Sequence, residues 1–142
     1  MPETSLPVEH LFTLRANVGA PTVIAGGPQG SRVLVPVPDG SFEGARLRGT
    51  LVAHSGGDWV TQRADGSVRL DVRITLMTDD GAGIYMSYAG IGVAGPGGLA
   101  LRTAPLFETG AEKYAWLNGV QGVATGISAN GTVTYEVYAL KV

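Results

Sequence analysis

The feature that most constrains the fold is a run of strict alternation from Val68 to Met77. One set of its side chains is apolar, Leu70, Val72, Ile74 and Leu76, and the other contains Arg69, Asp71, Arg73, Thr75 and Met77. Successive side chains of a strand point to opposite faces of a sheet, whereas a helix would mix the two sets on one surface. The run therefore predicts a β-strand with one apolar and one polar face.

Two turns flank this strand and make it the middle one of three. Asp65-Gly66 precedes it and Asp79-Asp80-Gly81 follows it, and such pairs supply the positive φ angles that hairpin turns require. The first strand of the set then begins near Asp58, and the third runs from Ile84 to Ala89. Asn130-Gly131 is the strongest two-residue hairpin signal in the chain and predicts another turn of this kind.

Short strand-like segments occupy most of the remaining chain. They are predicted at Val8–Val18, Arg32–Val37, Phe42–His54, Leu99–Thr109, Val120–Ile127 and Thr132–Val142, with brief pairing possible at Thr22–Ile24. Ile91–Gly98 is expected to be a flexible connection. Gly44 and Gly49 interrupt a strand pattern, which is typical of bulges or barrel corners.

These segments predict an all-β protein. Eight to ten strands joined by short turns favour antiparallel neighbours, and a closed sheet removes the exposed edges that an open one would leave. We therefore expect a single antiparallel, up-and-down-like β-barrel, similar to lipocalins or calycins. The 142 residues are expected to form one domain, 1–142.

Composition excludes several classes of function. The net charge is −2 and no basic run occurs, so we expect no nucleic-acid partner. There are no cysteines, which removes disulfides, thiolate metal sites and thiol nucleophiles. Neither a signal peptide nor an apolar run of about 20 residues is evident, so no membrane partner and a cytoplasmic location are expected. His10 and His54 stand far apart without a carboxylate pattern, and no metal or cofactor is predicted.

The chain resembles the domain-of-unknown-function 3237 family, small β-barrel proteins of bacteria and fungi. The segments that carry the resemblance are LFTLR (11–15), PQGSR (28–32), FEGARLRG (42–49), GGDW (56–59), RADG (63–66), LDVR (70–73), TDDGAGIY (78–85), FETG (107–110), YAWLN (114–118) and YEVYAL (135–140). They cover nearly the whole chain. The resemblance implies a β-barrel, and it implies little about activity, because the family is named for lacking an assigned one.

The polar face of the middle strand supplies the first group of candidate site residues. Asp71 and Arg73 lie two residues apart and project the same way, so in a lumen Arg73 could hold Asp71 ionised or bind an anionic substrate group. The alternative is an exterior ion pair worth under about 1 kcal/mol. Trp59, Arg63, Tyr85 and Tyr88 on the adjacent strands would complete an amphipathic pocket.

A second group of candidates lies nearer the C-terminus. Tyr114, Trp116 and Asn118 would share one face of an extended segment, where Trp116 could stack on an aromatic ligand and Asn118 could donate to it. Glu108 could act as a general base. The alternatives are an ordinary core position for Trp116 and a surface carboxylate for Glu108.

Three functions follow from these groups. The first is a cofactor-free acid/base enzyme of isomerase, cyclase or dehydratase type acting on an aromatic or polyketide-like metabolite. Its base is Asp71 or Glu108, Arg73 stabilises an anion, Tyr85 donates a proton, and Trp59 and Trp116 form walls. The second is a lipocalin-like carrier of a hydrophobic ligand. The third is a structural subunit of a homodimer or higher homo-oligomer, since isologous pairing is common.

Overall fold

The computed structural model describes residues 2–142, and twelve strands account for most of them. The elements are β1 (Val8–Asn17), β2 (Thr22–Gly27), β3 (Gly30–Pro36), β4 (Asp39–Glu43), β5 (Arg48–Leu51), β6 (Gly57–Gln62), β7 (Val68–Thr78), β8 (Gly83–Gly95), β9 (Gly98–Thr103), β10 (Leu106–Glu108), the 3₁₀ helix η1 (Glu112–Gly119), β11 (Gly122–Ala129) and β12 (Thr132–Leu140). The helix among these residues is too short to cross a bilayer.

Eight of the strands close into a ring. In order around it they are β8, β9, β11, β12, β1, β4, β5 and β7, and the β7–β8 pairing completes the circle. The pairings between neighbours are antiparallel. The predicted all-β, antiparallel, barrel-like fold is therefore confirmed.

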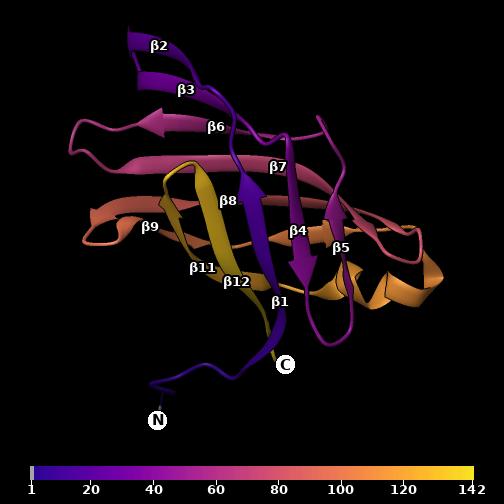
Figure 1. The fold of residues 1–142 in the computed structure, drawn as a ribbon. Helices are drawn as coiled ribbons and strands as arrows, with labels where there is room; N and C mark the ends of the chain where they lie inside the picture. The colour runs from indigo at the N-terminus through magenta and orange to yellow at the C-terminus, as the bar shows by residue number, and fades with distance from the viewer. Residues whose placement is uncertain (1) are drawn as a thin grey trace.

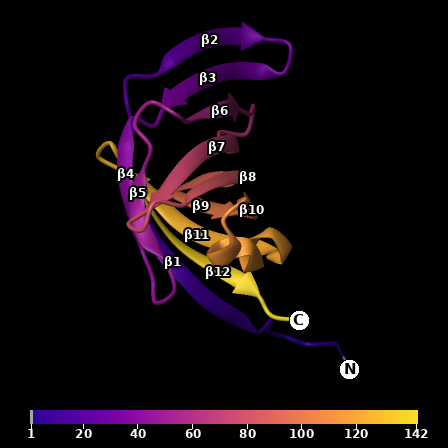
Figure 2. The ribbon, with the colours of Figure 1, turned by 90° about the vertical axis from the view of Figure 1, so that its right-hand side faces the viewer.

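A three-stranded extension, here called the flap, leaves the ring at β7. The second half of β7 pairs with β5, whereas its first half pairs with β6, which continues into β3 and β2. Figures 1 and 2 show β6, β3 and β2 following one another away from β7, so the flap forms an extra wall at one end of the ring. The sequence pattern did not reveal this branching, because alternation fixes a strand's faces but not its neighbours.

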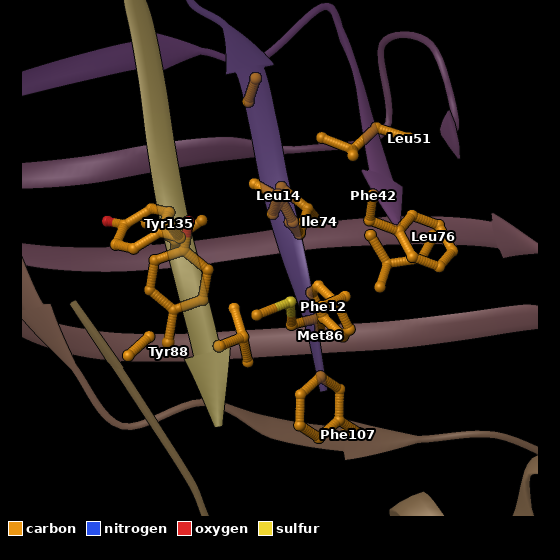
Figure 3. Close-up of a cluster of buried hydrophobic side chains, with 14 of the residues drawn as sticks. Phe12, Leu14, Phe42, Leu51, Ile74, Leu76, Met86, Tyr88, Phe107 and Tyr135 are labelled. Atoms are coloured by element: carbon orange, nitrogen blue, oxygen red, sulfur yellow. The ribbon is translucent and has the colours of Figure 1, made fainter. Parts of the chain in front are cut away.

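The other end of the ring is filled by a hydrophobic core. Phe12 is fully buried and lies near Phe42 and Phe107, with ring centroids 5.4 and 6.1 Å away. Leu76 and Met86 pack beside this aromatic group, as Figure 3 shows. The apolar set of the alternating run, Leu70, Val72, Ile74 and Leu76, is buried inside the ring. Its polar set therefore faces outward.

Four local expectations are wrong. The predicted strand Phe42–His54 is divided into β4 and β5, because the chain turns at Gly44–Leu47 and the two strands pair with each other. Ile91–Gly98 is no flexible connection, because β8 continues to Gly95 and pairs with β9. The predicted strand Leu99–Thr109 is divided at Pro105 into β9 and β10. Lys113–Asn118 is helical rather than extended, so Tyr114 and Leu117, one 3₁₀ turn apart, share the buried side.

Candidate functional site

A cavity of about 330 Å³ lies between the flap and the inner face of the ring. Its walls are mostly aliphatic side chains from β3, β6, β7 and β9. The polar side chains that line it are those of Asp58, Gln62, Tyr88, Ser128 and Tyr135. Among residues 2–142, Asp58 is the only charged residue in the lining, so its carboxylate has no cationic partner there.

Asp58 enters the cavity because it shares one face of β6 with Val60 and Gln62, which line the same cavity. The ladder between β6 and β7 holds at Asp58 and Thr61 but is interrupted at Trp59 and Val60. In the gap, the backbone N–H of Asp71 donates to Oδ1 of Asp58 at 3.0 Å. This side-chain bond replaces part of the ladder and fixes the carboxyl group at the cavity wall.

Burial raises the pKa of Asp58 to about 6, from an ordinary value of 3.8. The hydrogen bond from Asp71 N–H opposes this rise, and the negative charge of Asp71 adds to it. A carboxyl group with such a pKa exists in both protonation states near neutral pH. It can therefore accept a proton from one atom of a bound molecule and return one to another.

Two tyrosines come from opposite sides of the ring to the same cavity. Tyr88 of β8 and Tyr135 of β12 meet edge to face, with ring centroids 5.3 Å apart, and Figure 3 shows them beside the core. Gly126 is required beneath Tyr135, since a Cβ atom there would lie 2.4 Å from the ring. Burial raises the pKa of both hydroxyls, and the charge of Asp58 adds to each rise. Both phenols thus stay neutral and can donate hydrogen bonds.

The raised pKa of Asp58 predicts an unusual pH dependence of stability. Because the folded state binds this proton more tightly than the unfolded state, Asp58 favours folding most at low pH. Its contribution falls as the pH rises from about 4 to about 6, by up to about 3 kcal/mol. We expect the free energy of unfolding of the wild type minus that of Asp58→Asn to decline across this window, measured by urea denaturation. A difference that stays constant with pH would contradict the raised pKa.

The first group of predicted site residues lies mostly outside the ring. Asp71 and Arg73 form an exterior ion pair, with Oδ2 and Nη2 3.8 Å apart and both side chains about half exposed. Arg73 also lies over the ring of Trp59, 5.3 Å from its centroid. The interpretation that these three residues line a lumen is wrong, because closure of the ring turns the apolar face of β7 inward. Tyr88 is the one member of this group that lines the cavity.

The remaining candidates are dispersed. Arg63 lies in the β6–β7 turn, where its Nε donates to Ser67 at 2.9 Å. Tyr85, Glu108 and Asn118 come together in a shallow groove on the outer surface. The Asn118 amide is engaged there with the backbone of Thr109, donating at 3.0 Å and accepting at 2.8 Å, so it closes a loop.

Trp116 is not a cavity wall either. The guanidinium of Arg46 stacks on its ring at 3.6 Å, and the other side of the ring packs against the core. The shared face that would have joined Trp116 to Tyr114 and Asn118 required an extended segment. The 3₁₀ helix separates these three side chains instead.

Two residues of the cavity were missed by the sequence reasoning. Asp58 directly precedes Trp59, a residue of the first candidate group, but the alternation in Asp58–Gln62 does not show which face is buried. Tyr135 shares a face with Val133, Val137 and Ala139, which indicates an interior position. A tyrosine on an otherwise aliphatic face was the available signal, because a buried hydroxyl requires a partner.

Comparison with known proteins finds one protein family that matches most of the chain. Residues 6–140 match the model of a family described as "Protein of unknown function (DUF3237)". A UPF0311 protein of Rhodopseudomonas palustris is 28% identical over 127 residues, which are 80% of this chain and 82% of the relative. A β-barrel-like protein of Acinetobacter baumannii has a similar crystal structure, with a TM-score of 0.90, 27% identity and 99% of each chain covered.

One relative is named as an enzyme. The hydroalkoxylation enzyme phnH of Penicillium herquei is 29% identical over 123 residues, which are 87% of this chain and 76% of the relative. This barrel-like fold therefore occurs in a protein with a catalytic name.

Proposed function

The chain belongs to the DUF3237 family of proteins of unknown function, and on that premise we propose that it is a cofactor-independent acid/base enzyme. Its substrate is a small, largely apolar metabolite of aromatic or polyketide-like type that binds in the cavity between flap and ring. The observation that carries the proposal is Asp58, a carboxyl group without a cationic partner in an aliphatic cavity. Groups whose pKa is shifted toward neutrality inside a cavity are common at catalytic sites.

The name of the Penicillium relative suggests the reaction class. Hydroalkoxylation adds the O–H bond of an alcohol or phenol across a carbon–carbon double bond and forms an ether. The oxygen bonds to one alkene carbon, the O–H bond breaks, and a proton is delivered to the other carbon. When both groups belong to one molecule, the product is a cyclic ether and an isomer of the substrate. The reaction therefore requires proton transfer but neither an oxidant nor a reductant.

Asp58 supplies that proton transfer in our proposal. As a carboxylate it accepts the hydroxyl proton, and as a carboxylic acid it protonates the alkene carbon, so one group completes the cycle. Asp58 takes the role that the sequence had assigned to Asp71 or Glu108, both of which lie on the outer surface.

Tyr88 and Tyr135 orient the substrate by donating hydrogen bonds to its oxygen. We expect Tyr88→Phe and Tyr135→Phe each to lower kcat/KM by about 10²-fold, because each removes one hydrogen-bond donor from a cavity with mostly aliphatic walls. Steady-state kinetics of the two variants would measure this loss. Phenylalanine keeps the ring that packs in the core, so the melting temperature should change little. An unchanged kcat/KM in both variants would remove the tyrosines from the mechanism.

The experiment that tests the proposal offers the protein a set of ortho-alkenyl phenols and follows ring closure by chromatography and mass spectrometry. The expected result is a cyclic ether that forms faster than in buffer and with one enantiomer in excess. Enantiomeric excess is decisive, because only reaction inside a chiral cavity produces it.

A non-catalytic carrier is the second candidate, and the aliphatic walls favour it. A carrier would bind these phenols, as isothermal calorimetry would show, and would return them unchanged. The two functions also differ in their need for Asp58. An apolar carrier gains nothing from a partly buried carboxylate, and loss of its charge should strengthen the binding of an apolar ligand.

A further inference from the structure

The sheet has two edge strands, β10 and β2, and they differ in how well they are protected from pairing with another chain. β10 is only three residues long, carries the charge of Glu108 and packs beside η1. β2 is six residues long and pairs only with β3, so its outer backbone groups have no strand partner within residues 2–142. Figure 1 shows β2 as the outermost strand of the flap. Proteins usually protect such an edge, because it can pair with another chain.

The β2 edge has a register shift between Ile24 and Gly27, but it lacks the charged side chains that most often protect such an edge. No Asp, Glu, Lys or Arg occurs between Arg15 and Arg32, although charged residues make up 15% of the chain. Val23 and Ile24 are 56% and 65% exposed, and they project to opposite faces of the strand. A uniformly uncharged strand with large apolar side chains on both faces is therefore presented to the solvent.

We propose that a second copy of this chain pairs with β2, strand against strand and antiparallel, across a two-fold axis. Such a pairing places each strand opposite its own copy, so any charge near the centre would face a like charge. The charge-free composition of Thr22–Gly27 removes that repulsion between two molecules that each carry a net charge of −2. A partner of opposite charge would find no complementary group on this strand.

The inferred interface adjoins the cavity wall. Val23 pairs with Val33 of β3, so the two side chains lie on the same face of the flap, and Val33 lines the cavity. Pairing with a second copy would hold the flap strands in place and shield Val23 from water. The inference stands independently of the proposed enzyme, since a carrier would use the same interface.

Light scattering coupled to size-exclusion chromatography tests the proposal on the full chain. We expect the wild type to be a dimer, or to shift from monomer to dimer between low and high micromolar concentration, because a six-residue strand provides a small interface. Ile24→Lys should be a monomer throughout this range. Leu106→Lys is the matched control, because it adds the same charge to an exposed residue of the β10 edge, and it should keep the wild-type behaviour.

Cysteine cross-linking locates the contact. The chain contains no cysteine, so single substitutions at Thr22, Val23, Ile24 and Ala25 each introduce the only thiol. Directly opposed residues of antiparallel strands lie about 4.5–5.5 Å apart between Cα atoms, which permits a disulfide. At least one of these variants should form a disulfide-linked dimer, and Leu106→Cys should not. A monomeric wild type, or a dimer that survives Ile24→Lys with no cross-link at these four positions, would overturn the proposal.

Discussion

Asp58→Asn is expected to lower kcat for ring closure by about 10²- to 10⁴-fold, the usual contribution of a general acid or base. The asparagine amide keeps an oxygen that can accept the hydrogen bond from Asp71 N–H, so the contact between β6 and β7 should persist. It cannot exchange a proton near neutral pH. The substitution thus separates the chemical role of this residue from its structural role.

Binding and pH dependence distinguish this expectation from simple disruption of the cavity. The dissociation constant of an ortho-alkenyl phenol, measured by calorimetry, should be unchanged or lower in Asp58→Asn, because the cavity loses a buried charge. The wild-type rate should change with pH around the Asp58 pKa of about 6, and the residual rate of the variant should not.

Glu108→Gln provides the comparison that decides whether Asp58 or Glu108 is the general base. Glu108 was the other carboxylate that the sequence nominated as a base, and its side chain is exposed in the outer groove. The same carboxylate-to-amide change there should leave kcat within about two-fold of the wild type, since surface substitutions usually have small effects. A loss of rate in Glu108→Gln with full activity in Asp58→Asn would move the site to the outer groove.

Periodicity and turn residues were enough to predict most of the strands, and the number of strands predicted the barrel-like closure. The alternation in Val68–Met77 identified two faces correctly, and the turn residues separated the strands, because both signals are local. The alternation could not show which face of the strand lies inside the ring. Arg69, Asp71 and Arg73 would suit a polar lumen as well as a wet exterior, and only the closure of eight strands places Leu70 and Val72 inside.

The site itself depends on non-local pairing that the sequence does not display. Asp58 reaches the cavity because the pairing of β6 with β7 and β3 turns its face toward the ring, and Tyr135 approaches from β12, 77 positions further along the chain. The cavity exists because the flap branches from β7 instead of continuing the ring. Each of these features depends on which strands pair with each other, and strand propensity does not determine that.

Gly49→Ala is expected to destabilise the protein by about 3 kcal/mol or more, at the upper end of what overpacking costs. A Cβ atom at this position would lie 1.9 Å from the carbonyl oxygen of Met77 and 2.8 Å from Cα of Thr78. Both are backbone atoms of β7, so no side chain can rotate away. Relief requires β5 to separate from β7, and only three residue pairs join these strands. The substitution therefore opens the ring at one of its two shortest ladders.

Thermal denaturation would measure this effect against Gly83→Ala as the matched control. Gly83 faces Met77 from the other side of β7, and a Cβ atom there meets nothing within 4 Å. For a chain of this length, about 3 kcal/mol corresponds to a fall in Tm of roughly 6–12 °C in Gly49→Ala, whereas Gly83→Ala should be neutral or slightly stabilising. Because Leu51 of β5 adjoins the buried core, we also expect Gly49→Ala to lose cooperativity on unfolding. Equal melting temperatures of the two variants would show that β5 and β7 can separate at no cost, and that the ring does not depend on this close approach.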